Sequence, residues 1–220
     1  MIALGIDCST KLTNVGLSQD GVVLQEVNLE LGRQQSAKLP VLIEQVLNES
    51  GVRFADLDLI AAACGPGYYT GIRTGVAYAA ALAESLKLKI VPISTMELFV
   101  YDLRNTGVPL APVLKARRGS FYGAVYSSNG DELSAAVEPL FCKPAQFTEI
   151  LSKYKDALLV GSDAELYPEL LELPNERVKR LSGYGGQAAL MGEKYSNRAV
   201  LPRFVRGMYL REPDIGPTTD

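Results

Sequence analysis

The sequence contains no histidine and no tryptophan among its 220 residues. Histidine is the general base of most serine and cysteine hydrolases and the commonest protein ligand of zinc and iron. Its absence excludes Ser-His-Asp catalysis, Cys-His catalysis and histidine-ligated metal sites within this chain. Magnesium sites built from carboxylates alone remain compatible with the composition.

Cysteines and long apolar segments are also scarce. The three cysteines, Cys8, Cys64 and Cys142, are far apart and form no Cys-x-x-Cys pair, so we predict neither a disulfide framework nor a zinc site. No apolar segment reaches the roughly 18 residues that span a membrane, and the start of the chain has no secretion signature. The net charge of −3 gives no overall attraction for nucleic acid. We expect a cytoplasmic protein in which another chain supplies most contacts to any RNA.

The most distinctive segment is glycine-rich and covers residues 64–75. An apolar run before it predicts a buried strand, and small residues after it predict a helix over about 71–86, with Thr70 as N-cap. Such a junction directs free N–H groups and the helix dipole toward one place, which suits an anion. No Gly-Lys-Ser/Thr follows, so a Walker-type lysine is absent. Gly65 and Gly67 are candidate nucleotide contacts, and a turn that only allows tight helix packing is the alternative.

A second candidate for phosphate or magnesium follows the first predicted strand. Residues 2–31 show the pattern of three antiparallel strands, and a polar turn follows the first of them. In this turn Asp7, Ser9 and Thr10 have the oxygen atoms that a phosphate-bound metal requires. The alternative is an acidic turn capped by its own hydroxyl groups.

Two predicted helices form the candidate partner surface. Residues 36–47 carry apolar side chains at helical spacing, and the helix at 71–86 has small residues four apart. A ridge of small residues allows another backbone to approach closely, either the chain's own sheet or a partner helix. The candidate interface residues are Leu39, Leu42, Ile43, Val46, Gly71, Ile72, Gly75, Val76, Ala79 and Ala83.

The second half of the chain has its own pattern of strands and helices. A turn-rich stretch at 104–112 predicts a boundary, after which several short strands alternate with helices, including one at 164–171. We therefore predict an α/β fold with domains at 1–108 and 109–200. The tail at 201–220 is expected to pack partly on the first domain.

A local basic cluster lies in this second half. Lys115, Arg117 and Arg118 precede an aromatic strand and are candidate RNA contacts. A solvated strand end is the alternative interpretation.

Taken together, these positions resemble the TsaB (YeaZ) family, the bacterial partner subunit in making N6-threonylcarbamoyladenosine on tRNA. The resemblance covers nearly the whole chain and rests on segments 4–10, 36–47, 65–75, 115–119 and 209–211. The glycine-rich segment is the most specific of them. The sequence departs from the family pattern at Gln35, Ala37, Tyr68, Tyr69 and Lys115.

The resemblance implies a two-domain fold of the actin, sugar-kinase and Hsp70 superfamily, with mixed β-sheets flanked by helices. It also implies a non-catalytic scaffold or activator that docks through its two first-domain helices on the catalytic subunit TsaD, recruits the ATPase TsaE and forms a homodimer when alone. On this interpretation the chain has no catalytic residue, metal or cofactor of its own. ATP or ADP with magnesium would lie at a subunit boundary, and tRNA would be reached through the complex.

Two other functions remain open from the residues. A nucleotide-dependent kinase or ATPase of the same fold would use Asp7 and the glycine-rich segment to bind Mg-ATP. A glycoprotein protease is the third, and it has little support because the chain lacks histidine and a cluster of metal ligands.

Overall fold

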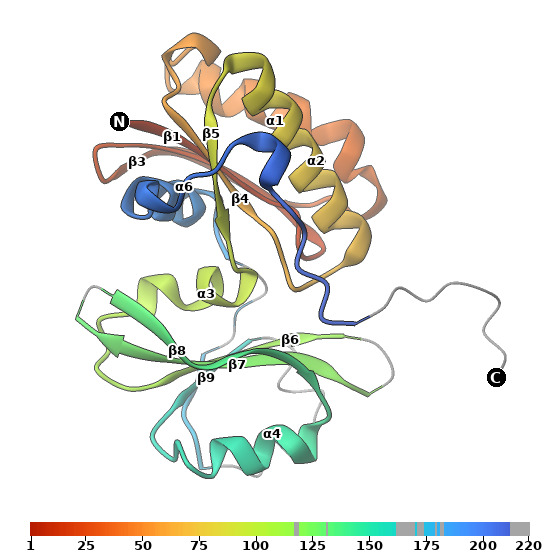
Figure 1. Ribbon diagram of the computed structural model, residues 1–220, viewed down its shortest axis with the longest axis vertical. Helices are drawn as coiled ribbons and strands as arrows, with labels where there is room; N and C mark the ends of the chain where they lie inside the picture. Colours follow the sequence, from red (N-terminus) through yellow and green to blue (C-terminus); the bar gives the residue numbers. More distant parts are fainter. Residues whose placement is uncertain are drawn as a thin grey trace, which may run out of the picture.

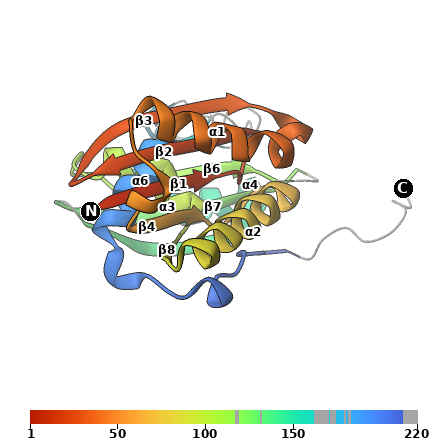
Figure 2. The same ribbon diagram turned by 90° about the horizontal axis from the view of Figure 1, so that it is seen from above.

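The computed structural model describes residues 1–116, 119–130, 132–161, 170, 174–178, 180 and 183–211. Within them, two β-sheets lie one above the other, with helices on their outer faces and a layer of helices between them (Figure 1). The view from above shows the helices of the first half running roughly along its strands (Figure 2). No helix in the part of the chain that the structure describes is long and apolar enough to cross a membrane.

The first sheet has the strand order β3-β2-β1-β4-β5. Its strands are β1 (Ile2–Asp7), β2 (Leu12–Gln19), β3 (Val22–Glu30), β4 (Leu59–Ala63) and β5 (Lys89–Ile93). The central strand β1 pairs antiparallel with β2 and parallel with β4, and β5 continues the parallel side. The three antiparallel strands predicted over residues 2–31 are thus confirmed.

The second sheet has the order β10-β9-β6-β7-β8 and repeats the same topology. Its strands are β6 (Leu110–Lys115), β7 (Phe121–Asn129), β8 (Glu132–Cys142), β9 (Leu158–Val160) and β10 (Arg177–Val178). Here β6 is the central strand, antiparallel to β7 and parallel to β9. The predicted pair of mixed sheets is therefore present.

The helices form three layers around these sheets. On the outer face of the first sheet lie α1 (Gln35–Glu49) and α2 (Tyr69–Leu86), and on the outer face of the second lies α4 (Pro144–Leu151). Between the sheets lie α3 (Thr95–Val100) and α6 (Gly185–Lys194). Short 3-10 helices complete the described elements: η1 (Gly32–Gln34), η2 (Phe54–Asp56), η3 (Tyr101–Leu103), η5 (Ser196–Arg198) and η6 (Pro202–Phe204).

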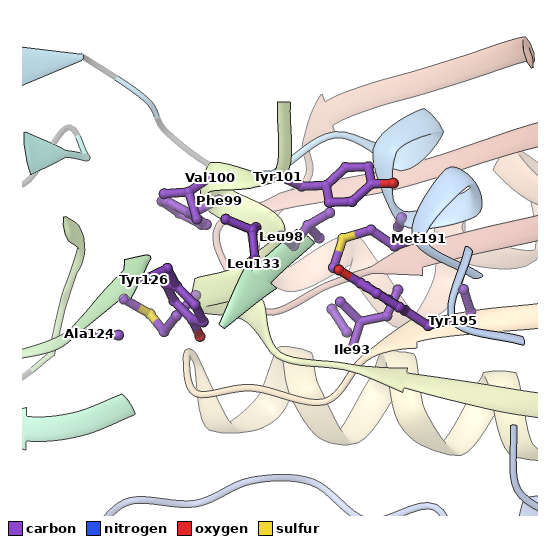
Figure 3. Packing of buried hydrophobic residues seen from close by; sticks show 14 of the residues in the cluster. Ile93, Leu98, Phe99, Val100, Tyr101, Ala124, Tyr126, Leu133, Met191 and Tyr195 are labelled. Carbon is purple, nitrogen blue, oxygen red and sulfur yellow. The ribbon is translucent and has the colours of Figure 1, made fainter. Parts of the chain in front are cut away.

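Side-chain alternation along the strands creates a separate core on each side of a sheet. In β1, Leu4 and Ile6 face α1 and α2, whereas Ala3 faces the central layer. The central core joins residues of both sheets to α3 and α6, as the packing of Phe99, Tyr126 and Met191 illustrates (Figure 3). The two halves therefore share one buried apolar region.

The chain returns to the first sheet earlier than we predicted. The boundary at residue 200 was expected to close the second domain, but α6 packs on β1 and β2, and Val200 forms a bridge with Ile90 of β5. Residues 185–200 therefore pack with the first sheet. Small residues on the inner face of β1 and on α6 explain this close packing, because their backbones are in direct contact.

Of two smaller predictions, one differs from the structure and the other lies mostly outside the described residues. The N-cap of α2 is Tyr68 and not Thr70, so the helix begins two residues earlier than predicted. The helix predicted at 164–171 lies outside the described residues except for Leu170.

Candidate functional site

The first polar turn and the glycine-rich turn lie against each other at one edge of the first sheet. They follow β1 and β4, which are parallel neighbours, so both turns emerge at the same edge. The N–H of Tyr68 donates a hydrogen bond to the carbonyl oxygen of Ser9 over 2.7 Å. A Cβ atom on Gly67 would lie 2.2 Å from that oxygen, and one on Gly71 would lie 1.9 Å from the carbonyl oxygen of Cys8. Glycine is therefore required because one backbone presses on another.

The candidate nucleotide-binding residues come together here but face the protein interior. Asp7, Ser9 and Thr10 are all buried. The carboxylate of Asp7 accepts hydrogen bonds from the N–H of Ser9 (2.8 Å) and from Nδ2 of Asn14 (3.0 Å). Burial raises the pKa of Asp7, and these hydrogen bonds act in the opposite direction.

Backbone contacts fill the space between Gly67 and Ser9 in these two turns. Gly67 already contacts Ser9, and Gly65 is buried beneath the C-terminal segment. Among the described residues, no group of three or more His, Cys, Asp or Glu side chains could hold a metal ion. The arrangement favours the structural interpretation of both turns.

Gln35 links the same turn to α1 and was recognised in the sequence only as a departure from the family pattern. Its Nε2 donates to the carbonyl oxygens of Thr10 (3.0 Å) and Leu12 (3.1 Å), and its side chain is buried. A polar residue just before an apolar helical pattern was the available signal. Its contacts could not be derived, because they depend on how the helix meets the turn.

The C-terminal segment covers the glycine-rich turn. The N–H of Met208 donates to the carbonyl oxygen of Cys64 over 2.6 Å. A Cβ atom on Gly65, whose φ is +108°, would lie 2.6 Å from the carbonyl oxygen of Met208. The ring of Tyr209 lies 5.0 Å from that of Tyr69, centroid to centroid. Residues at the end of the chain therefore complete this edge of the first sheet.

The candidate interface residues lie mostly on the inward side of α1 and α2. Nine of the ten are buried within the chain, and Val76 is half-buried. Gly71 and Gly75 pack on Cys8, so the ridge of small residues rests on the chain's own sheet. The outward side of the two helices consists of other residues, including Lys38, Val41, Glu44, Arg73, Ala77, Ala81 and Glu84.

The candidate RNA contacts lie at the end of β6. Lys115 is exposed there, whereas Arg117 and Arg118 lie outside the described residues. Lys115 occupies the position in the second sheet that Asp7 occupies in the first, since each ends the central strand.

A second glycine-rich turn begins α6 and is capped by the chain itself. Oδ1 of Asn28 accepts a hydrogen bond from the N–H of Gly185 (3.0 Å), and Oε2 of Glu26 accepts one from the N–H of Gly186 (2.9 Å). Both caps come from β3. The positive end of this helix is thus satisfied by a carboxylate of the same protein.

Two mixed sheets of equal topology, joined by a central helical layer, define the actin, sugar-kinase and Hsp70 class of folds. A ROK hexokinase from Thermus thermophilus has this fold and superposes with a TM-score of 0.53 at 13% identity, over 90% of this chain and 100% of that one. YeaZ from Pseudomonas aeruginosa superposes with a TM-score of 0.82 at 20% identity, over 95% of this chain and 99% of its own.

Sequence comparison places the chain more narrowly. The family model described as "TsaD: tRNA N6-adenosine threonylcarbamoyltransferase" matches residues 17–196. The protein named "tRNA threonylcarbamoyladenosine biosynthesis protein TsaB" from Bacillus subtilis (strain 168) is 30% identical over 202 residues, which is 91% of this chain and 86% of that protein. The chain belongs to this family, in its TsaB (YeaZ) branch.

Proposed function

We propose that this chain is a non-catalytic subunit required for N6-threonylcarbamoyladenosine modification of tRNA in the cytoplasm. The relationship to TsaB supports the pathway. The contact between the two turns supports the non-catalytic role, because the backbone of Gly67 and Tyr68 packs directly on the backbone of Ser9. The absence of histidine throughout the sequence is consistent with this role, since it excludes histidine-dependent catalysis and histidine-ligated metal sites in this chain.

The chain acts in this proposal by pairing with TsaD and recruiting TsaE, and it forms a homodimer when alone. The docking surface is the outward side of α1 and α2. On α2, Ala77 and Ala81 are exposed and one helical turn apart, so a partner helix can approach closely. On α1, Val41 is 54% exposed, and Ala37 one helical turn before it is also exposed. The buried ridge of Gly71, Gly75 and Ala79 holds α2 in position for this contact.

Omission of the chain from a reconstituted reaction tests the proposal. The reaction contains TsaD, TsaE, threonylcarbamoyl-adenylate and unmodified tRNA, and modified adenosine is quantified by mass spectrometry after nuclease digestion. Modification is expected only when this chain is added, and co-purification of the three proteins is expected in the same mixture. Normal modification without the chain would refute the proposal.

Titration with Mg-ATP separates this role from that of a nucleotide-dependent enzyme. The isolated chain is expected to show no binding and no turnover, whereas its complex with TsaD and TsaE binds ATP or ADP with magnesium at a subunit boundary. Micromolar binding with hydrolysis by the isolated chain would favour a kinase or ATPase instead.

A further inference from the structure

The C-terminal segment at residues 202–209 is held against α2 by two buried residues. Pro202 and Val205 are buried, and Val205 belongs to the apolar core beneath α1 and α2. The backbone hydrogen bond from the N–H of Met208 to the carbonyl oxygen of Cys64 fixes the far end of the segment. Figure 1 shows this segment running beside α2. We call residues 202–209 together with Tyr69 and Arg73 the tail surface.

Phe204 lies between the two inward-facing anchors and points outward, and Tyr209 and Tyr69 are exposed at the far end of the segment. Phe204 is 59% exposed, Tyr209 is 45% exposed and Tyr69 is 41% exposed. Exposure of three large rings on one short surface is uncommon in a monomer unless they have a partner. Tyr69 and Tyr209 contact each other, and Phe204 makes no ring–ring contact with another described residue.

Arginines lie beside these rings. The guanidinium carbon of Arg203 is 4.9 Å from the ring centre of Phe204, and that of Arg73 is 5.4 Å from the ring centre of Tyr69. Arg206 donates from Nη1 to the carbonyl oxygens of Arg203 and Val205, which leaves its other nitrogen atoms toward solvent. Among the described residues, none of these three arginines forms a salt bridge with a carboxylate.

Exposed rings and arginines occur together on the tail surface, and this combination suits unpaired RNA. The tail surface contains three arginines and no acidic residue, although the whole chain has a net charge of −3. Unpaired nucleotides stack on exposed rings while arginines bind the phosphates between them. A double helix offers no free base faces and would use the arginines alone.

We propose that the tail surface binds an unpaired segment of RNA, with bases stacked on Phe204, Tyr209 and Tyr69 and phosphates bound by Arg73, Arg203 and Arg206. The tRNA is the source of this segment, a point that rests on the proposed function. The surface differs from the predicted cluster around Lys115, which lies at the end of β6 in the second sheet.

Fluorescence anisotropy with the full chain tests this inference. The probes are a fluorescein-labelled anticodon stem–loop, a labelled oligouridine and a labelled RNA duplex. The chain is expected to bind the first two and to bind the duplex at least tenfold more weakly. Phe204→Ala and Tyr209→Ala are each expected to weaken binding of oligouridine about tenfold, the loss that one stacked base brings. Arg203→Ala and Arg206→Ala are each expected to lower the slope of log K against log salt concentration by about 0.7.

Two exposed residues of the second half serve as matched controls. Phe141→Ala removes an exposed ring from β8, and Lys153→Ala removes an exposed cation after α4. Both are expected to bind the probes like the unmodified chain, and Tyr209→Phe is expected to retain binding. Circular dichroism confirms that each variant is folded.

Three results would overturn the inference. They are no binding of oligouridine at low salt, equal binding by the tail variants, and equal affinity for duplex and unpaired RNA. A tail variant that keeps RNA binding but no longer co-purifies with TsaD or TsaE would identify the surface as a protein-docking site instead. Failure of the proposed function would appear separately, as tRNA modification that proceeds without the chain.

Discussion

The two faces of the first sheet are covered by helices that begin in the same way and end up in different environments. Both α2 and α6 follow a glycine-rich turn and carry small residues toward the sheet. The outer helix α2 keeps one side in solvent, whereas α6 lies between two sheets and is mostly buried. Similar sequence patterns therefore produced one helix that a partner can reach and one that it cannot.

The two faces of the first sheet contact their helices differently. On the inner face Gly5 and Gly16 contact the backbone of α6 directly, because a Cβ on Gly16 would lie 2.1 Å from Gly185. On the outer face a Cβ on Gly71 would lie 1.9 Å from the backbone of Cys8, whereas one on Gly75 would first meet the side chain of Cys8, at 3.3 Å. Contact between two backbones tolerates no added atom, whereas a side chain can move aside.

The largest effect is expected for Gly185→Ala. Its Cβ would lie 2.2 Å from the backbone carbon of Val15, so the helix and the strand must separate. We expect a loss of about 3 kcal/mol or more in the free energy of unfolding, the upper range for overpacking. Urea denaturation, monitored by circular dichroism, measures this loss in the free energy of unfolding.

Gly75→Ala on α2 is the matched comparison. Its Cβ would lie 3.3 Å from Cβ of Cys8, and alanine gains about 1 kcal/mol of helix propensity over glycine. We expect the free energy of unfolding to change by no more than about 1 kcal/mol. Equal destabilisation by the two variants would show that the two helix contacts do not differ in this way.

Much of this architecture was predictable, because strands and helices follow from the period of apolar residues. The first sheet, the α/β class and the presence of α1 and α2 agree with the sequence pattern, and the predicted start of α2 differs by two residues. The inward direction of the small-residue ridge was not predictable, since Gly71 and Gly75 show only that something lies close. The same holds for α6 and for Tyr209, whose positions depend on contacts between distant parts of the chain.

An intermediate effect on the free energy of unfolding is expected from Asp7→Asn, which replaces the buried carboxyl group beneath α2. The pKa of Asp7 is raised in the folded protein, so its contribution to stability is greatest below the pKa of the unfolded chain and is lost as the pH rises through the folded pKa. As the pH rises above about 4, the usual pKa of an aspartate, the unmodified protein should therefore lose stability relative to Asp7→Asn.

Urea denaturation across this pH range measures the difference, with Asp156→Asn, an exposed carboxylate beyond α4, as the control. The control curve is expected to run parallel to that of the unmodified protein. A parallel curve for Asp7→Asn would contradict the buried charge as the source of the pH dependence.

The smallest effect on stability is expected for Ala81→Glu, on the solvent side of α2. The residue is exposed, so the free energy of unfolding should change by less than about 0.5 kcal/mol. Association with TsaD, and with a second copy of the chain, should be weakened because a charge is placed in the proposed helix contact. Light scattering after size exclusion reports the association, and Ala81→Ser should associate normally. An unchanged oligomer with Ala81→Glu would remove this side of α2 from the interface.

The position of α6 has a consequence for synthesis of the protein on the ribosome. The inner face of β1 and β4 is closed by residues near the end of the chain, so a nascent polypeptide that stops before Gly185 leaves that face uncovered. The strands of the first sheet are therefore translated well before the helix that covers them. Their apolar inner face must remain protected, by transient contacts or by a chaperone, until α6 has left the ribosomal tunnel.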